Sequence, residues 1–279
     1  MVQRLEPREL LGGIPRQRPT QHGRTAPARE DRGAPAPAPV PAPAPAPAES
    51  PAPESRSVSA KVRARGVGRL LPTPVGTPFT FWYAVVLLAT SLYTDYGDPA
   101  TVSALLRGSS TDVAHLATTP LLVLVASALW VAGGLASAYA VGFVFVLTAL
   151  ERRIGGWRAA AVFLGGHVAA TLATELPVGL SVMAGHLPGT SLQRLDYGIS
   201  FGLLTCVGAL AGLLGPMARS VVLGWVSVVL LGDLLTYEDP LSNWGHPLAL
   251  LAGIAAWPVV RRWARDRAVA RRAHSGFAS

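Results

Sequence analysis

An uncharged stretch of 30 residues, LLVLVASALWVAGGLASAYAVGFVFVLTAL, occupies positions 121–150. A transmembrane helix needs about 20 apolar residues, so the stretch is too long for one upright span and too short for two spans with a turn. Gly133 and Gly134 divide it. The sequence therefore predicts an element lying in or on a membrane over 121–131 and a transmembrane helix over 135–150.

Further runs of the same character lie on both sides of this stretch. They cover residues 79–93, 157–176, 197–214, 221–237 and 244–260. Together with 135–150 they make six predicted spans. The fold class expected is therefore an all-α membrane protein, with a bundle of six transmembrane helices over 79–262.

The distribution of charge predicts the orientation of this bundle. Ten arginines fall on one side of the predicted membrane: Arg152, Arg153, Arg158, Arg219, Arg261, Arg262, Arg265, Arg267, Arg271 and Arg272. Only Arg107 and Arg194 fall on the other side. Since Lys and Arg are enriched in cytoplasmic loops, the chain is expected to be a multi-pass protein of the cell membrane with both termini in the cytoplasm.

The two ends of the chain differ from the apolar middle. Residues 1–78 hold 16 of the 24 prolines, 12 basic residues and 6 acidic ones, and include the run PAPAPVPAPAPAPAESPAP. We expect this segment to be a disordered cytoplasmic tail rich in Pro, Ala and Arg, and residues 263–279 to be a basic cytoplasmic tail.

The composition excludes several classes of protein. The long uncharged runs leave too little charge for a soluble enzyme of this size, and the single cysteine excludes a disulfide scaffold or a cysteine-based zinc site. The arginines are not interleaved with aromatic residues, so no nucleic-acid partner is expected. The sequence predicts no cofactor and no metal ion; the expected partners are the lipid bilayer and transmembrane proteins.

Two side chains could form a reactive pair. Ser200, in DYGISFG, and His246, in NWGHPLALLAG, both lie just inside the outer end of a predicted span, so their depths differ by only a few Å, at about 1.5 Å per residue. A neutral histidine can accept the proton of a serine hydroxyl and make it nucleophilic. The alternatives are a serine bonded to its own helix backbone and a histidine that anchors the helix at the interface.

Small residues would allow the two helices to approach. The fourth predicted span contains small residues at four-residue spacings, and the sixth has a nearly side-chain-free face below the histidine. These packing positions are Gly198, Gly202, Gly208, Gly212, Ala249 and Gly253.

In its order of elements the chain resembles the rhomboid intramembrane serine proteases, over roughly residues 79–262. The junction LERRIGGWR resembles the family pattern that closes the second span, with Glu151 and Gly155 as its structural residues, and HPLALLAG resembles the histidine motif, with Gly253 seven residues after His246. The resemblance implies that Ser200 is the nucleophile and His246 the general base of a protease that cleaves transmembrane substrates.

The chain departs from the family at several supporting positions. Phe201 follows the serine where rhomboids usually have glycine, and Leu135 and Tyr139 stand where the family has a histidine and an asparagine that hold the oxyanion. The Tyr139 hydroxyl and backbone N–H groups near Ile199 are the remaining candidate donors. Asp196 is expected first as a helix N-cap and second as an electrostatic neighbour of the pair.

These departures leave two alternatives to a protease. One is a catalytically inactive rhomboid-like protein that binds membrane clients. The other is a small-solute transporter, with Glu175 and Asp233 near the outer span ends within reach of water; the chain shows no internal repeat that would favour it.

His167, in the third predicted span, is expected to be a packed, hydrogen-bonded residue.

Overall fold

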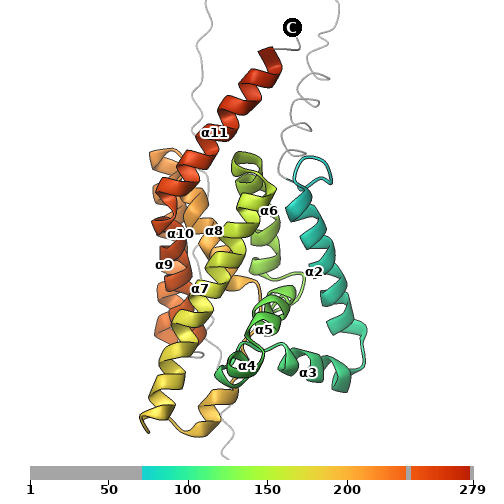
Figure 1. Cartoon of the computed structure of the whole chain (residues 1–279), viewed down its shortest axis with the longest axis vertical. Helices are drawn as coiled ribbons and strands as arrows, with labels where there is room; N and C mark the ends of the chain where they lie inside the picture. Colours follow the sequence, from blue (N-terminus) through green and yellow to red (C-terminus); the bar gives the residue numbers. More distant parts are fainter. Residues whose placement is uncertain (1–70, 237–239, 277–279) are drawn as a thin grey trace, which may run out of the picture. The chain divides into compact units, whose positions relative to one another are not determined.

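The computed structural model describes residues 71–236 and 240–276, and side chains within 71–236 and 243–273. This part of the chain is helical and contains no strand, which confirms the predicted all-α class (Figure 1). Its elements are α2 (Pro78–Tyr96), α3 (Pro99–Gly108), α4 (Val113–Thr118), α5 (Pro120–Ala126), η1 (Ser127–Leu129), α6 (Ala138–Ile154), α7 (Gly156–Met183), η2 (Gly189–Gln193), α8 (Ser200–Ala211), α9 (Pro216–Thr236), α10 (Pro240–Ala255) and α11 (Trp257–Gly276). Of the tail predicted over 1–78, residues 1–70 lie outside the described residues, whereas residues 71–77 lead into α2, which begins at Pro78.

Each apolar run of the sequence coincides with helices. The first five predicted spans fall on α2, α6, α7, α8 and α9, while the sixth is divided between α10 and α11. The predicted membrane-lying element over 121–131 is folded as α5 and η1. Among the described helices, α7 and α9 are long and apolar enough to cross a membrane by length and composition.

Short polar side chains fix where several helices begin. Asp98, Asp112 and Ser137 precede α3, α4 and α6, and each accepts a hydrogen bond from a backbone N–H in the first turn. Such bonds satisfy N–H groups that have no partner within the helix. The starts of α3, α4 and α6 are therefore determined by residues that are adjacent in the sequence.

Helix α2 is capped by a residue distant in the sequence. Glu151, at the end of α6 and 1% exposed, accepts hydrogen bonds from the N–H groups of Phe79 (3.1 Å) and Thr80 (2.8 Å) and from the Thr80 hydroxyl (2.6 Å). A carboxylate at a helix N-terminus is also stabilised by the helix dipole. Glu151 thereby joins the start of α2 to the α6–α7 junction.

Glycines make this junction possible. Gly155 has φ +96°, a conformation that other residues rarely adopt, and a side chain at Gly156 would bring Cβ to 2.8 Å from Glu151 Oε1. The two glycines let α7 begin directly after α6 without displacing the capping carboxylate.

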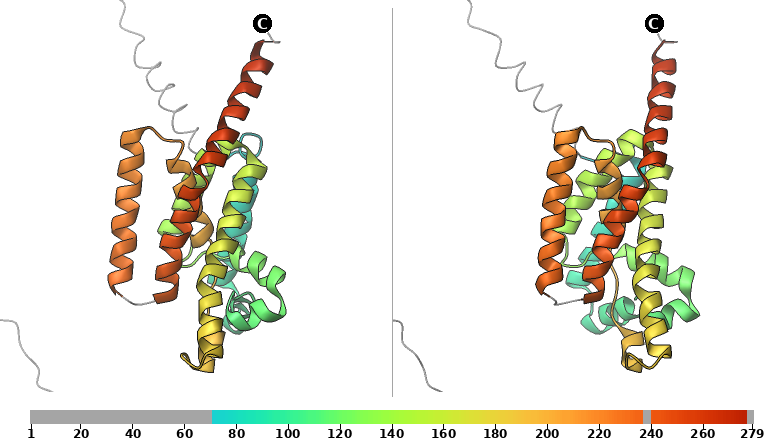
Figure 2. Two further views of the ribbon diagram at one scale, coloured as in Figure 1. Left: turned by 60° about the vertical axis from the view of Figure 1, so that its left-hand side comes forward. Right: turned by 90° about the vertical axis from the view of Figure 1, so that its left-hand side faces the viewer.

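Helix α8 is the most enclosed helix of the described part. Residues 201–209 are all buried, and α8 packs against α6, α7, α9 and α10. In contrast, α9 lies at the edge of the bundle and exposes Val221, Trp225, Val228 and Leu235 (Figure 2). An apolar exposed helix of this length is typical of a lipid-facing span.

Helices α8 and α10 approach so closely that their backbones touch. A Cβ atom at Gly253 would lie 2.8 Å from Ala209 N, and one at Gly208 would lie 3.0 Å from Ile254 N. We call this contact between α8 and α10 at Gly208 and Gly253 the seam. The Thr205 hydroxyl donates a hydrogen bond across it to the Ala249 carbonyl, at 3.0 Å. Small residues and interhelical hydrogen bonds hold membrane helices together in this way.

Substitution at this seam should therefore destabilise the bundle. We expect Gly253→Ala to lower the free energy of unfolding by about 1–3 kcal/mol, since the added methyl group overlaps the α8 backbone. Gly224→Ala is the matched control, because a Cβ atom at Gly224 on α9 meets nothing within 4 Å. Thermal unfolding in detergent measures both; an equal change in the two variants would contradict the tight contact.

Candidate functional site

Ser200 is the first residue of α8, three residues later than the predicted start of the span. The chain reaches it through Gly198, whose φ of +127° requires glycine and whose N–H donates to the Ser127 carbonyl at 2.9 Å. Ser200 is half-buried. Its hydroxyl makes no hydrogen bond within the described part of the chain.

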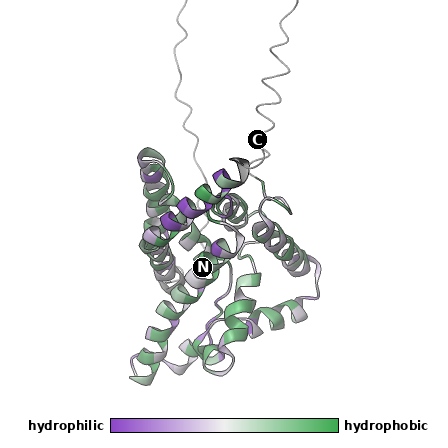
Figure 3. Ribbon diagram, turned by 45° about the horizontal axis from the view of Figure 1, so that its top comes forward, coloured by the Kyte–Doolittle hydropathy of each residue, from purple (hydrophilic) through white to green (hydrophobic). Residues whose placement is uncertain are grey.

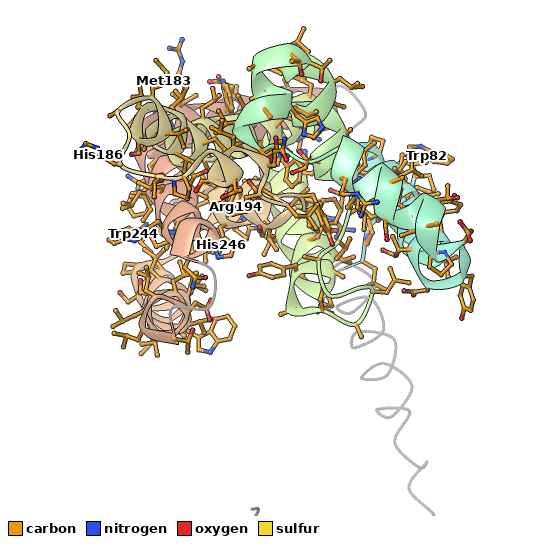
Figure 4. The ribbon with its side chains drawn as sticks, turned by 90° about the horizontal axis from the view of Figure 1, so that it is seen from below. Trp82, Met183, His186, Arg194, Trp244 and His246 are labelled. Atoms are coloured by element: carbon orange, nitrogen blue, oxygen red, sulfur yellow. The ribbon has the colours of Figure 1, made fainter. Side chains whose placement is uncertain are left out.

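His246 lies in α10 and is 7% exposed. Its ring packs against two aromatic rings, Tyr139 of α6 at a centroid distance of 5.8 Å and Phe201 of α8 at 5.5 Å with an interplanar angle of 76°. Seen from the end of the bundle where α10 begins, His246 lies on the same side of the molecule as Arg194 (Figure 4). The two predicted catalytic residues are therefore on neighbouring helices, α8 and α10.

Phe201 occupies the space between these two helices. A Cβ atom at Gly245 would collide with the Phe201 ring and lie 3.0 Å from Thr174 Cγ2, so glycine is needed beside it. No hydrogen bond joins Ser200 to His246 among the described residues. Phe201, which stands where rhomboids usually have glycine, packs against the histidine ring.

The three supporting residues predicted from the sequence, Tyr139, Ile199 and Asp196, lie in different parts of the structure. The Tyr139 ring packs beside His246 in a tilted arrangement, and Ile199 is buried directly before α8. Asp196 does not cap α8: the N-cap is Ile199, with no side-chain cap, and the Asp196 carboxylate accepts from the Thr111 hydroxyl at 3.1 Å. The expected capping role is wrong because the chain between Asp196 and Ser200 remains non-helical.

The segment leading to Ser200 is held by residues between α3 and α4. Thr111 N donates to the Asp196 carbonyl at 2.8 Å, and the Ser110 hydroxyl donates to the Arg194 carbonyl at 3.0 Å. Arg194 also forms an ion pair with Glu175 of α7, at 2.6 Å. Glu175 is 1% exposed, so the expectation that it reaches water is wrong.

A buried polar contact extends this support from α7. His167 Nε2 lies 3.0 Å from the Ser127 hydroxyl, and both residues are almost fully buried. This confirms that His167 is packed and hydrogen-bonded. Because the Ser127 carbonyl receives the Gly198 N–H, His167 is connected through Ser127 to the backbone that precedes Ser200.

The other packing glycines contact aromatic rings. A Cβ atom at Gly202 would lie 2.6 Å from the Phe163 ring, and one at Gly212 would lie 2.5 Å from Trp257 Cδ1. Trp257 Nε1 donates to the Gly208 carbonyl at 2.8 Å. These contacts place α8 against α7 on one side and against the start of α11 on another.

No metal-binding group is found in the described part: it contains no cluster of three or more His, Cys, Asp or Glu side chains suited to a metal ion. Cys206 is buried within α8 and is not bonded to another cysteine.

Removing the His167 side chain tests the support of the segment before Ser200. We expect His167→Leu to lower the free energy of unfolding by about 1–3 kcal/mol, because it leaves the buried Ser127 hydroxyl without this partner. His167→Gln, whose amide can replace the ring nitrogen, should be closer to wild type. Thermal unfolding in detergent compares them; equal losses for Leu and Gln would show that ring packing, and not the hydrogen bond, matters.

Comparison with known proteins identifies the family of the chain. A family model described as rhomboid-like protein matches residues 75–266, from just before α2 into α11. No curated protein and no solved structure matches the chain. Because the match covers more than half of the sequence and includes all helices from α2 to α10, the chain belongs to the rhomboid-like proteins, a membrane protein family.

Proposed function

We propose that this rhomboid-like membrane protein is an intramembrane serine peptidase with Ser200 as nucleophile and His246 as general base. The observation that carries the proposal is the placement of both residues on α8 and α10, whose backbones touch at Gly208 and Gly253. Phe201, the neighbour of Ser200, contacts His246 directly. Ser200 therefore directly precedes a residue that packs against His246.

The proposed reaction begins when the Ser200 hydroxyl moves within hydrogen-bonding distance of His246. The imidazole takes the hydroxyl proton as the oxygen attacks a peptide carbonyl; the same proton then passes to the leaving amine, and an acyl-enzyme remains. Water attacks this ester and gives a proton to His246, which passes it to the departing Ser200 oxygen; the carboxylic product leaves, and serine and histidine are restored. Catalytic hydrogen bonds that are long in a free enzyme commonly shorten when substrate binds.

A second candidate function is a non-catalytic binder of membrane proteins. It is favoured by Phe201 between α8 and α10 and by Leu135 and Tyr139 where the family has polar oxyanion residues. Loss of one oxyanion donor costs about a hundredfold to a thousandfold in turnover. The binder would use the same outer end of the bundle to hold client helices without cleaving them.

Labelling with a fluorophosphonate probe distinguishes the two functions. We expect purified protein in detergent to be labelled, Ser200→Ala to lose the label completely, and His246→Ala to label at least tenfold more slowly, because the serine is no longer deprotonated. Ser191→Ala, a serine in η2, is the matched control and should label like wild type.

Equal labelling of wild type and Ser200→Ala would contradict the nucleophile assignment. If wild type is folded but unlabelled, the binder is favoured, and membrane proteins crosslinked by a photoreactive residue at position 244 should then be recovered equally from wild type and Ser200→Ala.

We also propose that α2, α6, α7, α8, α9 and the α10–α11 pair form six spans, with the α11 end in the cytoplasm. The arginines of α11 and of the α6–α7 junction support this orientation. The residues that connect α7 to α8, including His186, would then face outward.

Cysteine accessibility tests the orientation in a Cys206→Ala background, which has no other cysteine. A membrane-impermeant maleimide should label His186→Cys in intact cells, and Arg272→Cys only after the membrane is permeabilised. The opposite pattern, or labelling of both in intact cells, would exclude the proposed topology.

A further inference from the structure

Three arginines converge where α11 passes the α6–α7 junction. Arg158 Nη1 donates to the Trp263 carbonyl at 3.1 Å, and Arg271 Nη2 donates to the Arg152 carbonyl at 3.1 Å. Arg267 packs onto the α6–α7 turn, because a Cβ atom at Gly155 would lie 2.6 Å from its Nη1. We call Arg158, Arg267 and Arg271 the arginine cluster.

Among the described residues, no carboxylate forms an ion pair with the cluster. None of its members forms an ion pair with any described residue, and the two ion pairs of the described chain, Asp112–His115 and Glu175–Arg194, involve other elements. Glu151 lies nearby, but its oxygens accept the three hydrogen bonds from Phe79 and Thr80. The negative charge of Glu151 therefore interacts with the N-terminus of α2 as well as with the arginines.

The arginines of the cluster also interact unfavourably with one another. Partial burial, together with the neighbouring charges of Arg271 and Arg158, lowers the pKa of the Arg267 guanidinium from its usual value, although the charge of Glu151 acts in the opposite direction. The Nε atoms of Arg158 and Arg267 are buried without a hydrogen-bond partner. The start of α7 adds positive potential, since it has neither a side-chain cap nor an acidic residue in its first turn.

Tryptophans place the cluster at the level of lipid headgroups. The Arg158 guanidinium lies 5.4 Å from the Trp157 ring and 5.6 Å from the Trp263 ring, and Trp157 is 69% exposed. Trp157 lies in the first turn of α7, which is long and apolar enough to span a membrane. Tryptophan is enriched at membrane–water interfaces, and the hydrophilic residues of α11 gather beyond the apolar bundle (Figure 3).

We propose that the arginine cluster binds the phosphate of an anionic phospholipid, with Trp157 against its glycerol and upper acyl chain. Guanidinium groups donate paired hydrogen bonds to phosphate oxygens, and the phosphate supplies the negative charge that the neighbouring carboxylates do not. Basic pockets between membrane helices bind acidic headgroups through this chemistry. The site does not involve Ser200 or His246, so it stands apart from peptidase activity.

Native mass spectrometry of the full chain in neutral detergent tests the site, with phosphatidylglycerol as the probe and phosphatidylcholine as the neutral lipid. We expect tight binding of phosphatidylglycerol and about tenfold weaker binding in Arg158→Gln/Arg267→Gln. Arg262→Gln/Arg265→Gln removes the same charge from exposed positions on another face of α11 and should bind like wild type.

Each other outcome would overturn the proposal. Equal loss in the two double variants would mean attraction to the general positive charge, and equal binding of phosphatidylcholine would mean recognition without charge. Competition by inorganic phosphate at the same concentration as the lipid would assign the cluster to a free anion. If Arg158→Gln/Arg267→Gln fails to fold, the exposed Arg271→Gln replaces it, with Arg262→Gln as control.

Discussion

The direct backbone contact between α8 and α10 is the constraint on which the arrangement of the bundle depends. It exists because Gly208 and Gly253 carry no side chains, and the Thr205–Ala249 hydrogen bond fixes its register. With this register fixed, Phe201 lies against His246 and Ser200 lies at the same end of the two helices. Helix α8 can then be buried along almost its whole length, although it is one of the shorter helices. The candidate site is therefore a product of helix packing and not of a separate loop.

Polar groups inside the bundle have specific partners, and those partners join segments that are distant in the sequence. The His167–Ser127 contact and the Gly198–Ser127 bond support the start of α8, whereas Glu175 and Arg194 fix the chain that leads to it. A buried polar group without a partner is costly in an apolar environment, so each of these bonds also specifies which segments lie together. At the α6–α7 junction, the hydrogen bonds of Glu151 to Phe79 and Thr80 join distant segments in the same way. A small number of residues therefore determines which helices and connecting segments lie together.

Much of the helical order could be predicted from the apolar runs, because a stretch of uncharged residues in a membrane protein must satisfy its own backbone. The start of α8 could not be predicted in the same way. Residues 197–199 are apolar or small, but Gly198 bonds to Ser127 and Asp196 to Thr111, which lie 71 and 85 positions away. The Glu175–Arg194 pair was missed for the same reason: no local spacing connects α7 with the chain before α8. Ser200, His246 and the seam glycines carry sequence signals, while the contact of Phe201 with His246 depends on the packed structure.

The hydrogen bonds of Glu151 have a consequence for biogenesis. The carboxylate that completes the first turn of α2 belongs to a residue synthesised 71 and 72 positions later. Until α6 has left the ribosome and entered the bundle, the N–H groups of Phe79 and Thr80 must be satisfied by water or headgroups, so this end of α2 stays at the wet surface. Arrival of Glu151 replaces those contacts and joins the earliest helix to the middle of the chain. The order of synthesis and the order in which helix ends become fixed are therefore different in this protein.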